Sequence, residues 1–269
     1  MKIAVAQLAC ALGDVSANVC KMRDFAERAH EAGANLILFP EMSDTGYNMG
    51  VIRQEARPWS EGAVPELQEI ARRHALTIVS GVSEKEGELI YNSQVVIDAE
   101  GAIIAKYRKT HLFAPAPIEE DKCCTAGISL TNIALTGFQC GLAICYDLRF
   151  PEILRALAVD QKTNVFLVSS AWPYPRVEHL RILATARAIE NQSYLVLANR
   201  VGTDEGVKFC GSSAVIDPAG VIMAEARTDS EELLVAELAE SEVKKVRRAM
   251  PVFSHRRQDL YTSRPKATG

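Results

Sequence analysis

The sequence predicts an α/β protein in which two mixed β-sheets pack face to face between outer layers of helices. Three observations lead to this prediction. Strand-like and helix-like segments alternate along the 269 residues. No Pro/Gly/Ser-rich linker interrupts them, so we expect one domain over residues 1–269. A hairpin-like sequence near residue 100 also recurs near residue 220, which indicates two halves of related fold.

The first half of the chain contains three predicted strands, two predicted helices and a predicted hairpin. Residues 2–9 alternate like a strand, and the amphipathic helix after them ends near Gly33, because glycine commonly terminates helices. A second amphipathic helix has Pro65 near its start, where proline is tolerated. The other elements are two short apolar strands and a hairpin turning at Glu100–Gly101, expected at residues 35–39, 77–82 and 93–108.

The second half repeats this alternation. The strand GLAIC (141–145) precedes a helix from about Pro151. A strand, a helix and a strand follow at residues 164–170, 179–192 and 194–201. From about Val243 the chain becomes basic and polar, which predicts a solvated helix and a C-terminal arm; packing of this arm on a partner subunit is the alternative.

The recurring hairpin carries the strongest evidence for internal symmetry. SQVVIDAEGAIIAKYR (93–108) resembles SSAVIDPAGVIMAEAR (212–227), and the offset from Gly101 to Gly220 is 220 − 101 = 119. Any two hairpins share apolar alternation and a turn glycine. The same gap-free offset also matches charged residues, however, such as Asp98 with Asp217 and Arg108 with Arg227. We therefore expect pseudo-two-fold halves that form a four-layer α-β-β-α sandwich.

Composition excludes several classes of protein. The chain is 48% hydrophobic and 24% charged, as is usual for a globular protein, and its net charge of −4 argues against nucleic-acid or membrane partners. It has no apolar run long enough to span a bilayer and no signal-peptide pattern.

Its seven cysteines include no CxxC pair, so we expect reduced thiols in a cytoplasmic protein. Its five histidines show no HExxH spacing, so we expect no metal site.

Three segments end in a reactive side chain: ANLILFPE in Glu41, AKYRK in Lys109 and GLAIC in Cys145. Strand ends can converge at one rim of a sheet, where α/β proteins place their ligands. Together these side chains supply a base, a cation for a developing oxyanion and a nucleophile, as acyl transfer from an amide or nitrile requires. Taken singly, each residue also fits a structural role. Glu41 could cap a helix or lie at the surface, Lys109 could belong to a solvent-exposed run of charged residues, and Cys145 could be an inert buried thiol.

Cys145 differs from the other strand cysteines because a polar turn leading into a helix follows it at once. A nucleophile at such a turn stands above the sheet, and the backbone N–H of Tyr146 could face the reacting carbonyl. We expect the adjacent helix N-terminus to lower the pKa of this thiol.

FPEMSDTGY, KYRKTHLF and GLAICYDLRFPE resemble the three signature motifs of the nitrilase superfamily of carbon–nitrogen hydrolases, in the family's order and at its usual separations. SSAWP, ARAIENQ and NRVG resemble its flanking stretches. This resemblance implies Glu41 as general base, Lys109 as stabiliser of the oxyanion and Cys145 as nucleophile. It also implies a second glutamate seven residues before Gly127, which is 127 − 7 = 120, or Glu120. The adjacent Glu119 remains an alternative.

The implied activity is that of an amidase, which hydrolyses a small aliphatic amide through a cysteine thioester without metal or organic cofactor. CYD at the nucleophile, where nitrilases usually have CWE, disfavours nitriles. The loop HLFAPAPIEEDKCCTAG (111–127) differs from the longer acidic insert of ω-amidases. An ω-amide of a dicarboxylate and a simple aliphatic amide therefore both remain open, as do N-carbamoyl amine hydrolysis, nitrile hydrolysis and acyl transfer. A catalytically silent binding protein is disfavoured because the triad is intact.

Six residues are candidates for shaping the substrate site: Tyr47, Phe113, Tyr146, Arg149, Trp172 and Pro173. Arg149 could bind a substrate carboxylate bidentately, or could pair with Asp147 or Glu152. We expect His111 to support the Lys109 loop. The resemblance further implies a homodimer or a larger homo-oligomer.

Overall fold

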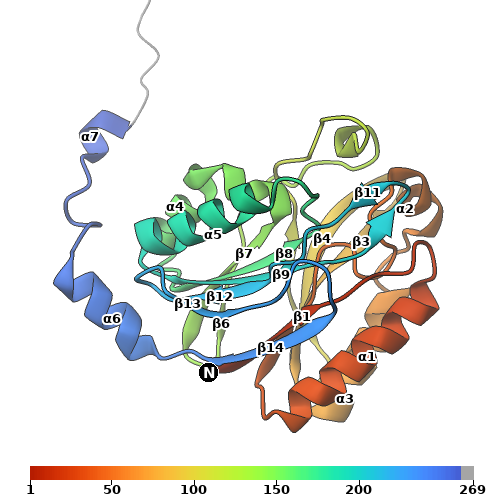
Figure 1. Cartoon of the computed structure of the whole chain (residues 1–269), viewed down its shortest axis with the longest axis horizontal. Helices are drawn as coiled ribbons and strands as arrows, with labels where there is room; N and C mark the ends of the chain where they lie inside the picture. Colours follow the sequence, from red (N-terminus) through yellow and green to blue (C-terminus); the bar gives the residue numbers. More distant parts are fainter. Residues whose placement is uncertain (262–269) are drawn as a thin grey trace, which may run out of the picture.

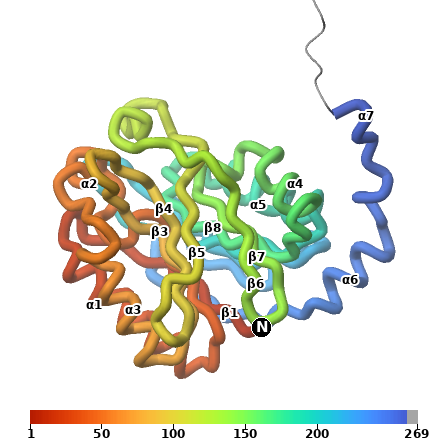
Figure 2. The backbone as a smooth tube through the Cα atoms, turned by 180° about the vertical axis from the view of Figure 1, so that it is seen from behind, coloured from red at the N-terminus to blue at the C-terminus, as the bar shows by residue number. Residues whose placement is uncertain are grey.

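The computed structural model describes residues 1–261 and places two six-stranded sheets face to face (Figures 1 and 2). Helices cover the outer face of each sheet, so the layers run helix, sheet, sheet, helix. This is the predicted four-layer sandwich. One apolar cluster fills the space between the sheets and extends under the second helix layer, whereas another lies between the first sheet and its helices.

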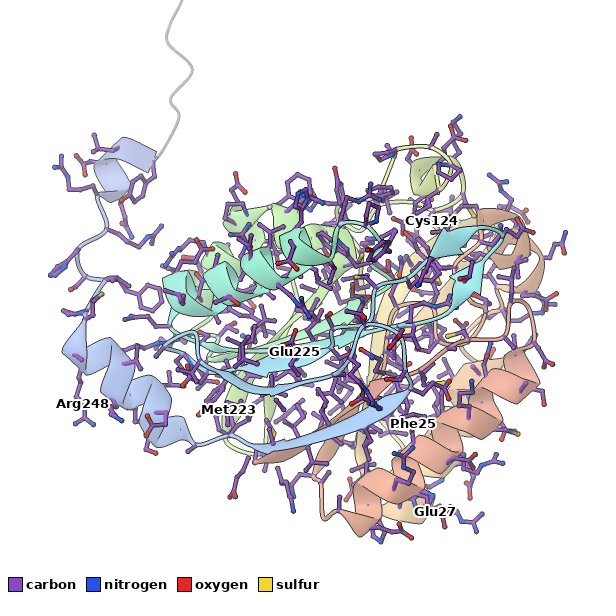
Figure 3. All side chains as sticks on the ribbon, in the orientation of Figure 1. Phe25, Glu27, Cys124, Met223, Glu225 and Arg248 are labelled. Carbon is purple, nitrogen blue, oxygen red and sulfur yellow. The ribbon has the colours of Figure 1, made fainter. Side chains whose placement is uncertain are left out.

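The first sheet has the strand order β14-β1-β2-β3-β4-β5. Its central strands β1, β2 and β3 are parallel, and the outer pairings are antiparallel. Helix α1 presents Phe25 toward the strands and Glu27 to solvent (Figure 3), as its amphipathic sequence requires. The elements are β1 (Lys2–Gln7), α1 (Val15–Glu31), β2 (Leu36–Leu38), α3 (Ala63–His74), β3 (Thr77–Glu86), β4 (Leu89–Ile97), β5 (Ile103–Arg108) and β14 (Glu232–Glu237).

The second sheet has the order β13-β12-β9-β8-β7-β6, with parallel strands again at its centre. Its elements are β6 (Asn132–Leu135), β7 (Phe138–Ile144), α4 (Pro151–Asp160), β8 (Val165–Ser170), α5 (Val177–Asn191), β9 (Tyr194–Asn199), β12 (Ala214–Ile216) and β13 (Ile222–Glu225). Smaller elements are α2 (Met49–Glu55), η1 (Glu120–Lys122), η2 (Cys145–Arg149), β10 (Thr203–Asp204), β11 (Val207–Lys208), α6 (Glu240–Ala249) and α7 (Gln258–Tyr261).

The two halves have the same topology. In each, two parallel steps are followed by two antiparallel ones, β1-β2-β3-β4-β5 in one sheet and β7-β8-β9-β12-β13 in the other. The recurring hairpins match in detail, because each has a register shift at its bulge and an aspartate, Asp98 or Asp217, that accepts two turn N–H groups. Gly101 and Gly220 both have positive φ in these turns. The pseudo-two-fold prediction is confirmed.

Helix α6 follows the edge strand β14 and packs against the end of the second helix layer, while α7 projects from the sandwich (Figure 1). Val243 of α6 is buried in the core cluster, and Arg247 donates to the carbonyls of Thr163 at 2.8 Å and Gln192 at 3.2 Å. The predicted arm from about Val243 therefore includes most of α6, while residues 262–269 lie outside the described part. Within residues 1–261, no helix is long and apolar enough to cross a membrane.

Candidate active site

The structure brings Glu41, Lys109, Glu120 and Cys145 together at one end of the sandwich. Glu41 lies just beyond β2, Lys109 directly follows β5, Cys145 directly follows β7, and Glu120 begins η1. The side chains of Glu41, Lys109 and Glu120 have no solvent exposure, and Cys145 is 6% exposed. Four chain segments that are remote in sequence thus meet at the ends of strands from both sheets.

Lys109 lies between the two carboxylates. Its Nζ donates to Glu41 Oε1 at 2.7 Å and to Glu120 Oε2 at 2.7 Å. The Asn92 side chain, on β4, bridges the same two acids, because its Nδ2 donates to Glu41 Oε1 at 2.6 Å and to Glu120 Oε1 at 2.6 Å. The four side chains therefore form a closed ring of charge-assisted hydrogen bonds.

Backbone groups hold the remaining carboxylate oxygens. Glu41 Oε2 accepts from Ala171 N at 2.8 Å, and Glu120 Oε2 accepts from Phe113 N at 2.8 Å. The main chain at Glu41 also packs directly against Gly81 of β3, where an added Cβ would lie 2.5 Å from Glu41 Cα. Residue 81 therefore has to be glycine for β3 to support the Glu41 backbone this closely.

Burial and neighbouring charges together raise the pKa values of both Glu41 and Lys109. Burial raises the pKa of Glu41, Lys109 opposes this rise and Glu120 adds to it. Burial alone would lower the pKa of Lys109, but the carboxylates of Glu120 and Glu41 outweigh it and hold that pKa well above its usual range. Lys109 is therefore a permanent cation, whereas Glu41 has the raised pKa of a carboxyl that can both take and return a proton.

Cys145 is held in a strained turn. Its φ is +44°, in the left-handed region that β-carbon-bearing residues rarely adopt, and it opens the short helix η2. Burial raises the pKa of its thiol well above the usual value, and the charge of Glu41 adds to the rise. The prediction that a helix N-terminus lowers this pKa is wrong, because the cost of burying a thiolate beside a carboxylate is the larger effect.

Asp147 ties the nucleophile turn to the Lys109 loop. Its carboxylate accepts from Ile144 N at 2.9 Å, from the Tyr107 hydroxyl at 2.8 Å and from His111 N at 3.2 Å. The His111 ring also stacks on Phe150, with centroids 3.8 Å apart. His111 thus lies where we expected it, as a support for the loop that carries Lys109.

A narrow pocket with a cavity volume of about 10 Å³ opens above Cys145. Phe113 and Tyr146 pack edge to face in its wall, with ring centroids 5.1 Å apart. All six predicted substrate-shaping residues line this pocket: Tyr47, Phe113, Tyr146, Arg149, Trp172 and Pro173. Sequence reasoning missed three further lining residues: Ile118, Ala171 and Arg176.

Two arginines at this pocket lie on aromatic walls. The Arg149 guanidinium is 4.7 Å from the Trp172 ring centroid, and that of Arg176 is 5.6 Å from the Phe113 centroid. Within residues 1–261, neither guanidinium lies within 4 Å of a carboxylate. The alternative in which Arg149 pairs with Asp147 or Glu152 is therefore wrong: Asp147 turns away to Ile144 N and Tyr107.

The structure also separates the two adjacent glutamates. Glu120 is buried and bonded to Lys109, while Glu119 is partly exposed and pairs with Lys122 at the surface.

No sequence pattern indicated Asn92 as a site residue, because a polar residue within an alternating strand usually faces solvent. In the described part of the chain, no group of three His, Cys, Asp or Glu side chains could hold a metal ion.

Comparison with known proteins gives a consistent result. Residues 2–248 match the model of the carbon–nitrogen hydrolase family. The chain is 35% identical to a 2-oxoglutaramate amidase of Bacillus subtilis over 96% of this chain and 98% of that one. It is 33% identical to a nitrilase of Pyrococcus abyssi over 97% and 99%.

A solved structure shares the fold at high coverage. It is the E41Q mutant of the amidase from Nesterenkonia sp. AN1 after Michael addition of acrylamide at its active-site cysteine. The TM-score is 0.83 and the sequence identity 31%, over 95% of this chain and 100% of that one.

Proposed function

The chain belongs to the carbon–nitrogen hydrolase family, and we propose that it is an amidase that hydrolyses a small aliphatic amide to a carboxylate and ammonia. The observation that carries this proposal is a thiol that lines one pocket, with a buried acid and a buried ammonium close to it. The amidase relatives from Bacillus subtilis and Nesterenkonia support it.

In this mechanism Glu41 removes the proton from Cys145, and the sulfur attacks the amide carbon. The thiol is neutral in the resting enzyme, since burial and the nearby acid raise its pKa, so a base in place is required. Protonated Glu41 then delivers its proton to the departing ammonia. A water activated by Glu41 hydrolyses the thioester, which releases the carboxylate and restores the thiol.

Lys109 and the Tyr146 N–H stabilise the tetrahedral oxyanion. Tyr146 is the second residue of η2, and the first N–H groups of a helix have no acceptor within that helix. Glu120 does not take part in proton transfer in this scheme: it fixes the Lys109 ammonium at 2.7 Å and keeps it charged.

The pocket favours an amide that carries a carboxylate at its far end. Arg149 and Arg176 lie at the pocket without an acidic partner within residues 1–261, and burial lowers the pKa of Arg149. Because a nearby anion stabilises a partly desolvated guanidinium, a substrate carboxylate would supply the missing negative charge. An ω-amide of a dicarboxylate meets this requirement, and the 2-oxoglutaramate amidase relative supports that class.

Ammonia release from a substrate panel tests the function. The panel contains propionamide, glutaramate, an N-carbamoyl amine and a nitrile, with Cys145→Ala as the blank. We expect release from glutaramate and propionamide, and loss of both in Cys145→Ala. A well-folded protein that releases no ammonia and forms no adduct on Cys145 by mass spectrometry would refute the amidase proposal.

The other members of the panel decide among the alternatives. Release from the nitrile alone would favour the activity named for the Pyrococcus abyssi relative. Release from the N-carbamoyl amine alone would favour a carbamoyl amidohydrolase. Adding hydroxylamine distinguishes acyl transfer, because hydroxamate formed faster than acid would identify an amine as the preferred acceptor.

We further propose one cytoplasmic domain that assembles as a homodimer or larger homo-oligomer through α5 and β13. This surface exposes apolar side chains, among them Ile182 (64% exposed), Val221 (60%) and Met223 (42%). Arg181 on α5 pairs with Glu225 on β13 at 2.8 Å, so the two elements lie side by side, and Figure 3 shows Met223 and Glu225 at the sheet edge. Light scattering of wild type and Ile182→Glu tests it: a smaller mass for the variant is expected.

A further inference from the structure

Asn92 lies at the centre of the site although it bears no reactive group. It is a mid-strand residue of β4 with no solvent exposure, paired across to Ser83 of β3. Its backbone carbonyl accepts from Lys109 N at 2.8 Å, so the strand also fixes the start of the Lys109 loop. Its side-chain amide reaches both carboxylates of the ring at 2.6 Å.

The orientation of this amide follows from its neighbours. Only an NH₂ group can lie 2.6 Å from two ionised carboxylates, since an amide oxygen there would face like partial charge. The arrangement leaves the other end of the amide unsatisfied, because Asn92 Oδ1 is buried with no hydrogen-bond partner in the described structure. An unsatisfied buried acceptor is destabilising, so packing alone does not account for asparagine at this position.

The charges around Glu41 explain what this amide does. The groups that face Glu41 are the Glu120 carboxylate from η1, the Lys109 ammonium after β5, the Cys145 thiol of η2 and the Tyr47 phenol before α2. Two carboxylates share one ammonium, which leaves one negative charge in excess in a buried site. Asn92 is the one neutral side chain of the ring, and it donates to both carboxylates in addition to the backbone N–H groups of Ala171 and Phe113.

Resting on the proposed amidase function, we infer that Asn92 is a positioning residue that holds the carboxyl groups of Glu41 and Glu120 around one Lys109 and favours the charged form of Glu41. Each N–H of its amide stabilises one carboxylate without adding a charge that would neutralise the general base. A second lysine here would hold Glu41 too firmly to accept a proton. The neutral amide therefore leaves Glu41 able to cycle between its two protonation states.

Removal of the amide should move the acid limb of the activity profile. Without two donors the charged form of Glu41 is less favoured, so its pKa rises and a smaller fraction is ionised at low pH. Asn92→Ala should move the acid midpoint of kcat/KM upward by about one to two pH units, the range expected for loss of a hydrogen bond to a charged group. Below that midpoint, activity should fall roughly tenfold to a hundredfold.

Asn92→Asp keeps the shape but changes the chemistry. The new carboxyl should hold a proton beside two acids and donate through its single O–H. As pH rises and that proton leaves, a third negative charge appears, so kcat/KM should decline on the alkaline side where wild type has a plateau. This second variant keeps the inference testable if Asn92→Ala folds poorly.

Asn18→Ala is the matched control. Asn18 is also buried and also donates twice from Nδ2, but to the backbone carbonyls of Ala11 and Asp44. It should lower the thermal midpoint without moving the acid limb. Folded Asn92→Ala and Asn92→Asp whose profiles have the wild-type shape, reduced only in height, would overturn the positioning role. Absence of amide hydrolysis by wild type would instead refute the proposed function.

Discussion

Replacing Lys109 with methionine should expose the charge imbalance of the site as a pH-dependent loss of stability. Lys109 is the only cation between two buried carboxylates in the described site, with a 2.7 Å hydrogen bond to each. Methionine retains much of its volume but none of its charge. Breaking a buried, hydrogen-bonded pair by removing one partner costs about 3–5 kcal/mol of the free energy of unfolding, because a buried charge is left without compensation.

The pH dependence gives the sharper test. Without the ammonium, which opposes the rise caused by burial, the pKa of Glu41 in the folded variant should lie above the unfolded value of about 4.3. The folded variant then binds more protons than the unfolded chain, so its stability falls as pH rises from about 4.3 through the raised folded pKa. Each extra bound proton contributes a slope of about 1.4 kcal/mol per pH unit. The loss should therefore be larger at pH 8 than at pH 5.

Urea unfolding at the two pH values, monitored by circular dichroism, measures this directly. Lys122→Met is the control, because Lys122 pairs with Glu119 on the surface and should change neither stability nor its pH dependence measurably. A Lys109→Met loss that is the same at pH 5 and pH 8, or a loss no larger than that of Lys122→Met, would refute the account of two acids held by one buried ammonium.

Three further outcomes follow from the same geometry. The kcat/KM of wild type should fall as pH is lowered, with a midpoint above the ordinary pKa of a glutamate, because burial raises the pKa of Glu41. It should remain level past pH 9, because burial raises the pKa of the Cys145 thiol well above its usual value. Activity unchanged down to pH 4 would contradict this. Gly81→Ala should lower the thermal midpoint and kcat together, since its Cβ would lie 2.5 Å from the Glu41 Cα, an overpacking cost of about 1–3 kcal/mol. Asp204→Ala should cost about 3–5 kcal/mol in urea unfolding, because it removes the 2.9 Å partner of the fully buried Arg200; a loss below 1 kcal/mol would show that water replaces the pair.

The sequence by itself determined the layers of this protein. Periodicity located the central strands and the covering helices, because each must present an apolar face to the core at its own spacing, but it did not predict the edge strands β6 and β14 or helix α2. The offset of 119 between the hairpins at Gly101 and Gly220 revealed the two halves, since the same turn with an aspartate and a positive-φ glycine recurs in both. Residue order and motif resemblance also predicted Glu41, Lys109 and Cys145 as the reactive set.

Only the tertiary structure decided how these residues are arranged. It selected Glu120 over Glu119, because a left-handed turn at Glu119 directs one side chain to Lys109 and the other to the surface. It also placed Asn92 between two acids, a contact across 92 − 41 = 51 residues that no local pattern encodes. The physical reason is general: local periodicity fixes which face of an element is buried, whereas hydrogen bonds, burial and pKa depend on partners that arrive from distant segments.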